Sequence, residues 1–204
     1  MSRIDVLKSL LRSTALAAAD KVKNAPAATS ARQLIEQAGV MRVRIGEAAL
    51  TAAVARAAGA TAATVRAQQS KLLVDASFDG ADHPLRIAIW PASWSFAPLG
   101  AKEIAFSVEP IEALRDPRAQ DVCAALATEI AHGLWRSVIG PVPPGDSTAF
   151  VSCEGDHLVA DLRSVPAVRK SLAKKLAMTF IEAVKPQRID IDSGELRIAL
   201  KLAG

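Results

Sequence analysis

The feature that most constrains the fold is one long amphipathic segment, from Asp116 to Val138. Apolar side chains recur there at every fourth position, and a second apolar row lies beside the first. The two rows are Val122, Leu126, Ile130, Leu134 and Val138, and Cys123, Ala127, Ala131 and Trp135. A stripe this broad predicts a helix that is buried deeply against a sheet.

Before this helix the apolar residues recur at every second position, which is typical of β-strands. Three such rows follow one another: Leu72, Val74, Ala76 and Phe78; Leu85, Ile87 and Ile89; and Ile104, Phe106 and Val108. The segment from Asp79 to Pro84 supplies turn residues between the first two rows. The sequence therefore predicts an antiparallel meander in the middle of the chain.

The last segment shows the clearest alternation. Ile189 and Ile191 alternate with charged residues, and Ser193-Gly194 then turns the chain into a further alternating segment that ends at Leu202. A two-residue turn would place Asp190 opposite Arg197, which is a favourable cross-strand pair. This pattern predicts a hairpin with one buried and one solvated face.

The other expected elements are helices and one more hairpin. The helices are an amphipathic one over residues 1–23, a short one over 31–39, an Ala-rich one over 46–58 and a long one over 166–184. The hairpin pairs residues 149–153 with 157–162. These patterns together predict an α+β fold, with antiparallel sheet packed on long amphipathic helices.

A Pro/Gly-rich segment, residues 140–145, is the best internal boundary because it suits neither a helix nor a central strand. It divides the chain into an N-terminal helical segment (1–43), a unit of helix, meander and long helix (44–139) and a unit of hairpin, helix and hairpin (146–204), packed as one compact body. Leu85-Arg-Ile-Ala-Ile89 resembles Leu196-Arg-Ile-Ala-Leu200. This echo raises the alternatives of two similar halves and of chance similarity between amphipathic strands.

Composition and charge exclude several classes of protein. Only 5 Phe and 3 Trp are aromatic, so the core must be aliphatic. The net charge of +4 arises in the N-terminal third, without the basic runs that nucleic-acid surfaces use, so we expect no nucleic-acid partner. The chain has neither a signal-peptide pattern nor a long apolar run, and we expect a cytoplasmic protein.

No motif predicts catalysis, a metal or a cofactor. Asp79, Asp82 and His83 are explained by a turn, and Asp190 to Glu195 lacks most of a calcium loop. His132 and His157 have no evident nucleophile nearby in the sequence, and both are interpreted as structural. Cys123 and Cys153 are expected to be reduced, buried thiols in a helix and a strand. We therefore expect a protein that is not an enzyme.

The segment from Trp90 to Gly100 contains two of the three tryptophans. It falls where the meander should turn, and aromatic residues in a loop with Pro and Gly often form a contact surface. The alternative is a short extra strand on which Trp94 and Phe96 point inward and pack on the long helix.

The order of elements from Arg44 to Val138 resembles the tubular lipid-binding (TULIP; BPI/SMP-like) superfamily. An Ala-rich helix, a meander that ends in Phe106-Ser-Val-Glu-Pro110 and a long amphipathic helix carry this resemblance, and the strand Leu158 to Leu162 with its following helix continues it. It is a resemblance of layout. It implies a long helix rolled in a curved antiparallel sheet, with an apolar groove for lipid tails.

The leading hypothesis is noncatalytic binding of a lipid or acyl chain in a groove between the sheet and the long helix, because aliphatic walls suit ligands that need few hydrogen bonds. The predicted lining residues are Leu72, Val74, Phe78, Ile87, Ile89, Trp94, Phe96, Ile104, Phe106, Leu126, Ile130 and Leu134. The same residues could instead form an ordinary core. A different hypothesis is an adaptor or structural module that docks on a protein or an anionic membrane through the basic residues 1–23.

Overall fold

The computed structural model describes residues 41–97, 101–139, 148–166 and 184–202. These residues form nine β-strands, two α-helices and two short 3-10 helices, and every strand pairing is antiparallel. The predicted α+β class with antiparallel sheets is therefore confirmed. The expected helices over 1–23 and 31–39, and nearly all of the one over 166–184, lie outside the described residues.

The larger sheet has six strands in the order β2-β3-β4-β5-β7-β6. The strands are β2 (Ala62–Gln68), β3 (Lys71–Ser77), β4 (Leu85–Phe96), β5 (Lys102–Glu109), β6 (Phe150–Glu154) and β7 (His157–Asp161). Strands β3, β4 and β5 are the predicted meander, and β6 with β7 is the predicted hairpin. Strand β2 was not predicted, because Thr64 and small Ala side chains hide its apolar alternation.

The smaller sheet has three strands in the order β1-β9-β8. The strands are β1 (Met41–Gly46), β8 (Val184–Asp192) and β9 (Glu195–Leu202). The predicted hairpin is confirmed, with Asp190 opposite Arg197 and Gly194 in the turn at a φ of 85°. The assignment of Val184 to the end of a helix was wrong, because this residue begins β8 and pairs with Leu202.

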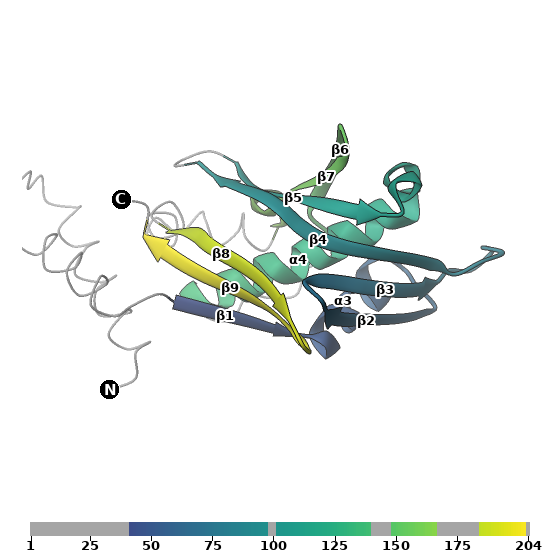
Figure 1. Cartoon of the computed structure of the whole chain (residues 1–204), viewed down its shortest axis with the longest axis horizontal. Helices are drawn as coiled ribbons and strands as arrows, with labels where there is room; N and C mark the ends of the chain where they lie inside the picture. The colour runs from purple at the N-terminus through teal and green to yellow at the C-terminus, as the bar shows by residue number, and fades with distance from the viewer. Residues whose placement is uncertain (1–40, 98–100, 140–147, 167–183, 203–204) are drawn as a thin grey trace, which may run out of the picture.

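The two sheets lie side by side and are connected by hydrogen bonds near both ends of β8. Trp94 Nε1 on β4 donates to the Pro186 carbonyl at 3.1 Å, and the Gly194 N–H donates to the Ala67 carbonyl at 3.1 Å. No ladder joins the sheets among the described strands. Figure 1 shows that together they cover one side of the long helix. Each sheet contains strands from both sides of the predicted boundary at 140–145.

The long helix is α4 (Pro117–Ile139), and it matches the segment predicted from the apolar stripe. It is preceded by the 3-10 helix η1 (Ile111–Arg115). A second helix, α3 (Glu47–Ala57), packs on α4 and β2 and matches the predicted Ala-rich helix. Gly133 lets α4 approach the small sheet closely, since a Cβ there would lie 2.9 Å from Ile45 Cδ1.

The segment around the tryptophans is continuous strand, and the loop interpretation was wrong. Strand β4 runs through Trp90 and Trp94 to Phe96 and pairs with β5 along this length, with a register shift between Pro91 and Ser93. Proline is tolerated here because the β-bulge interrupts the ladder at this point. Of the alternative interpretation, a short extra strand with Trp94 and Phe96 pointing inward onto the long helix, the structure bears out the strand and the inward direction, but the strand is the continuation of β4.

Candidate functional site

Most of the predicted lining residues lie on the inner face of the large sheet or on α4. Nine of them are buried: Leu72, Val74, Ile87, Ile89, Ile104, Phe106, Leu126, Ile130 and Leu134. Strands β3, β4 and β5 supply the first six, and one face of α4 supplies the last three. All nine belong to one hydrophobic cluster, so the sequence pattern identified the inner face of this interface correctly.

Phe78, Trp94 and Phe96 differ from these nine because they are only partly buried. Phe78 lies beyond the end of β3, and the Arg118 guanidinium carbon is 5.9 Å from its ring centroid. It therefore stands at the start of α4, next to a cation. Trp94 and Phe96 lie at the other end of β4, where the two sheets meet.

The bulge in β4 determines which way these two aromatic residues point. Before it, Trp90 faces Ser107 on the outer side of the sheet; after it, Trp94 faces the buried Ile104 and Phe96 faces the buried Lys102. Residues directly opposite each other in an antiparallel pair share a face. Trp94 and Phe96 therefore point inward, yet each retains exposed surface.

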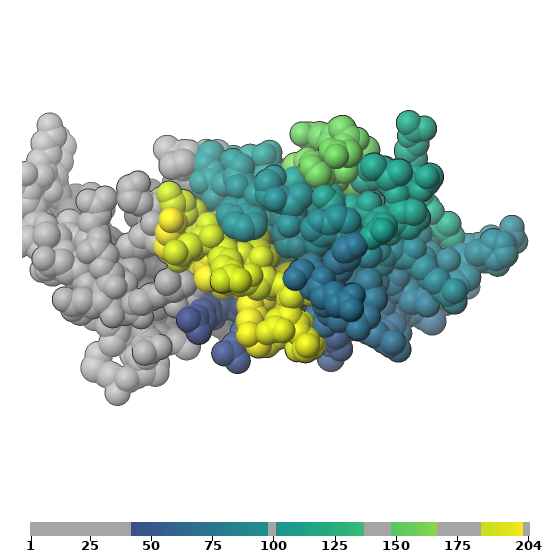
Figure 2. All heavy atoms as spheres, viewed as in Figure 1, coloured from purple at the N-terminus to yellow at the C-terminus, as the bar shows by residue number. Residues whose placement is uncertain are grey.

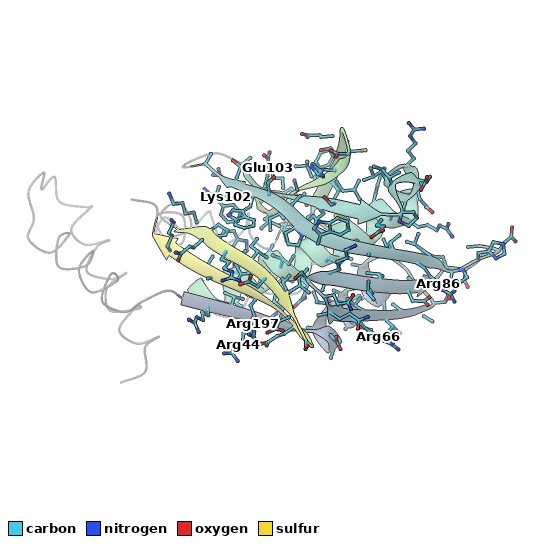
Figure 3. The ribbon with its side chains drawn as sticks, viewed as in Figure 1. Arg44, Arg66, Arg86, Lys102, Glu103 and Arg197 are labelled. Atoms are coloured by element: carbon cyan, nitrogen blue, oxygen red, sulfur yellow. The ribbon has the colours of Figure 1, made fainter. Side chains whose placement is uncertain are left out.

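A buried lysine lies beside this aromatic end. The Lys102 side chain has 0% exposure, its Nζ donates to the Ala97 carbonyl, and it lies 6.0 Å from the Phe96 ring centroid. Figure 3 labels Lys102 and Glu103 at the start of β5, beside the end of β4. The aromatic end thus combines partly exposed rings with one cation, whereas the other buried residues of the inner sheet surface, Phe106 included, are apolar.

The opposite face of α4 is polar and also buried. Thr128 Oγ1 donates to the Ala124 carbonyl and accepts from the Ala149 N–H at 2.8 Å. Burial raises the pKa of Glu129, while burial and the positive charges of Arg136 and Arg56 lower the pKa of His132.

Two buried nitrogens on this polar face have no hydrogen-bond partner among the described residues. They are His132 Nε2 and Trp135 Nε1, in side chains with 5% and 2% exposure. Such atoms are uncommon in protein interiors, because the bond to water that they lose is normally replaced. His132 is thus buried, but without the full set of partners that a structural histidine usually has.

A serine and a histidine that are distant in the sequence meet on the outer face of the large sheet. Ser107 Oγ lies 3.3 Å from His157 Nδ1, and His157 Nε2 lies 3.4 Å from Asp156 Oδ1. No pattern in the sequence indicated this contact, which depends on the pairing of β5 with β7. The Asp156 side chain is 72% exposed. In nucleophilic catalysis by a serine, a third residue holds the histidine base in place, and hydrogen-bond donors stabilise the negatively charged oxygen that forms on the substrate. This exposed group on a paired sheet offers neither.

The remaining candidates are the turn residues and the two cysteines. The Ala81 N–H donates to the Phe78 carbonyl within the predicted turn, and no metal-binding group of three His, Cys, Asp or Glu side chains occurs in the described part of the chain. Burial raises the pKa of Cys123 to about 12, so its thiol stays protonated. The expectation of burial was wrong for Cys153, which is exposed because β6 is an edge strand.

Comparisons with known proteins add no assignment. No family model, no curated protein and no solved structure matches the chain. Within the described residues, no helix is both long enough and apolar enough to cross a membrane.

Proposed function

We propose that this protein binds an apolar ligand, a lipid or acyl chain, between α4 and the sheets without catalysing a reaction. The observation that carries the proposal is the position of Trp94 and Phe96, which point inward but retain exposed surface at the junction of the two sheets. A ligand would enter past these rings, because aromatic side chains offer large apolar surface at low cost in entropy.

The chemistry of the interface supports this class of ligand. Mostly aliphatic side chains form the inner face of the sheet, and several small alanines lie on α4, including Ala119, Ala127 and Ala131. An alkyl chain placed there would lose little hydrogen bonding and would bury apolar surface, at roughly 25 cal/mol per Å2. The side chains of this interface are almost fully buried, so binding requires the interface to open.

The junction between the sheets is the place where opening costs least. Strand β8 is joined to β4 through the bond from Trp94 Nε1 to the Pro186 carbonyl, whereas the strands within each sheet are joined by ladders. Separating the sheets along β8 therefore breaks this bond and the bond from the Gly194 N–H to the Ala67 carbonyl, each of which would cost about 1 kcal/mol.

Membership of the tubular lipid-binding superfamily is part of the same proposal. A long helix against antiparallel sheets agrees with the layout that the resemblance implies. The second long helix and the two similar halves are further parts of this proposal. The two segments of similar sequence, Leu85 to Ile89 on β4 and Leu196 to Leu200 on β9, are both strands whose alternate side chains are buried. The adaptor hypothesis stays a prediction, since residues 1–23 lie outside the described residues.

The test uses the two tryptophans of β4, which lie on opposite faces of the same strand. Lipid extraction and native mass spectrometry of the purified full chain should detect a copurifying acyl chain. A brominated fatty acid should then quench tryptophan fluorescence saturably. Most of this quenching should be lost in Trp94→Phe and retained in the matched control Trp90→Phe. Absence of both copurifying lipid and saturable quenching, or equal quenching in the two variants, would refute the proposal.

A further inference from the structure

The outer face of the three-stranded sheet carries an excess of positive charge. Its side chains are those that alternate with the buried residues of β1, β8 and β9. The basic ones are Arg42, Arg44, Lys185, Arg188, Arg197 and Lys201, and the acidic ones are Asp190, Asp192 and Glu195. We call these nine residues the basic face. Figure 2 shows the hairpin β8–β9 of this face exposed toward the viewer, beside the large sheet.

The charges within the basic face are unevenly distributed. The acidic residues lie toward the turn at Gly194, where Asp192 lies opposite Glu195 on the neighbouring strand. At the other end of the hairpin, Lys185 lies opposite Lys201. Arg44 stands directly opposite Arg197, and Figure 3 labels both on neighbouring strands. Like charges directly opposite in a sheet are destabilising, so this arrangement is not explained by stability of the sheet.

Within the described part of the chain, two of these six cations form ion pairs. Arg188 forms an ion pair with Asp190, and Arg197 forms ion pairs with Glu195 and Asp192. The other four cations have no ion-pair partner in the part of the chain that the structure describes. They are Arg42, Arg44, Lys185 and Lys201, and none of them is buried.

The geometry of the basic face suits a planar, negatively charged partner. Side chains on one face of a sheet are spaced by roughly 6.6 Å along a strand and roughly 4.8 Å between strands, so the cations are spread over a broad surface and do not converge on one phosphate. No outward position of the face carries an aromatic ring to stack on bases, and this three-stranded sheet is wider than the two-stranded ribbon that the major groove of DNA admits. An anionic lipid headgroup layer fits the array best.

The position of the basic face relates it to the proposed ligand entrance. Lys185 precedes Pro186, whose carbonyl accepts the bond from Trp94 Nε1, and Arg188 follows two residues later. The array therefore flanks the junction where Trp94 and Phe96 retain exposed surface. A protein held on a membrane by this array would have that junction at the edge of the contact.

We propose that the basic face docks the protein on an anionic phospholipid membrane, which serves as the source or destination of the apolar ligand. The docking stands on the charges of the face alone, whereas its role in ligand exchange rests on the proposed function. Each Lys or Arg close to an anionic membrane surface strengthens binding by roughly fivefold, so the four unpaired cations together suffice for measurable, reversible attachment.

The experiment is sedimentation of the full chain with vesicles of phosphatidylcholine alone or with added phosphatidylglycerol. We expect binding only with phosphatidylglycerol. The binding should weaken as salt rises from 50 to 500 mM, because the distance over which charges attract each other falls to roughly 10 Å at 0.1 M salt and is shorter still above that. The double variant Arg42→Gln/Lys201→Gln should bind about 25-fold more weakly. The control Arg86→Gln/Arg115→Gln removes the same charge from exposed positions outside the basic face and should bind as the wild type does.

Other results would overturn the docking proposal. These are equal binding to both vesicle types, an equal loss in the control variant, or no sedimentation at 50 mM salt. Tighter binding of the wild type to a DNA duplex than to the charged vesicles would also overturn it. Quenching by a brominated fatty acid without vesicles separates the two proposals, since it should be the same in the wild type and the Arg42/Lys201 variant. Vesicle binding without any quenching by the fatty acid would support docking on the membrane and refute the proposal that the protein binds an apolar ligand.

Discussion

The two faces of α4 are buried to a similar extent but by different chemistry. Leu126, Ile130 and Leu134 face the sheets with at most 1% exposure. About half a turn round the helix, Thr128 and His132 are also buried, at 7% and 5% exposure. An apolar face gains stability from almost any close packing, whereas a buried polar face must satisfy each group individually. Substitutions on the two faces should therefore fail in different ways.

The largest loss of stability should come from the apolar face. Ile130→Ala removes a fully buried side chain between helix and sheet, and the lost apolar burial and the resulting cavity should cost about 2–5 kcal/mol of unfolding free energy. Urea unfolding followed by circular dichroism measures this. The control Asp121→Ala, at an exposed position of the same helix, should change stability by less than about 0.5 kcal/mol. Similar effects of the two would contradict deep burial of the apolar face.

On the polar face, loss of one hydroxyl should matter more than loss of volume. Thr128→Val keeps the shape of the side chain but leaves the Ala149 N–H without its acceptor, which should cost about 1–3 kcal/mol. Thr128→Ser loses a methyl group and keeps the hydroxyl, and it should retain more stability than the valine variant in the same urea titration. If the serine variant is the less stable one, packing and not hydrogen bonding governs this face.

The close contact between Gly133 on α4 and Ile45 on β1 should give a smaller change in stability when either residue is substituted. Gly133→Ala gains about 1 kcal/mol of helix propensity but places a Cβ 2.9 Å from Ile45 Cδ1, so the two effects should nearly cancel. Ile45→Val removes Cδ1, and in that background Gly133→Ala should be stabilising. A double-mutant cycle should give a coupling free energy of at least about 0.5 kcal/mol. Additive effects would show that Ile45 moves aside freely.

The smallest effect should be the pH dependence of the polar face. Burial and the charges of Arg136 and Arg56 lower the pKa of His132 in the folded chain. The unfolded chain therefore takes up this proton first as the pH falls, and the stability that His132 contributes above about pH 6.5 is lost below it. Burial raises the pKa of Glu129, so its contribution has the opposite sign: it is present at low pH and is lost as the pH rises through that raised value.

Urea midpoints at pH 5.5 and 7.5 measure these opposing contributions. Relative to the wild type, His132→Gln should lose less stability on acidification, and Glu129→Gln should lose more. An unchanged pH dependence in His132→Gln would show that the histidine is not shielded from solvent in the folded chain.

Local periodicity made the main elements predictable. The stripe through Leu126 and Ile130 identified α4, and the alternation through Ile87 and Ile189 identified strands of both sheets. Strand β1 carries the same signal, since Val43 and Ile45 alternate with arginines. That signal was missed because the segment is short and was assigned to the boundary between two predicted regions.

The direction of the aromatic residues could not be read from the sequence. Whether Trp94 points inward depends on a register shift of one residue between Pro91 and Ser93, and that shift reverses the face of every residue after it. For the same reason, the contact of Ser107 with His157 appears only once β5 pairs with β7. Bulges and pairings of strands are fixed by contacts between distant segments, which a local pattern does not contain.

By itself, the sequence determined which side chains would be buried against α4, because the period of apolar residues reflects the geometry of helix and strand directly. The tertiary structure alone decided how the strands divide into two sheets and where these meet, at Trp94 and Pro186. It also decided that Arg44 and Arg197 would lie together on one outer face. These outcomes depend on the pairing of strands from opposite ends of the chain, which is selected by packing of the whole core and not by any one segment.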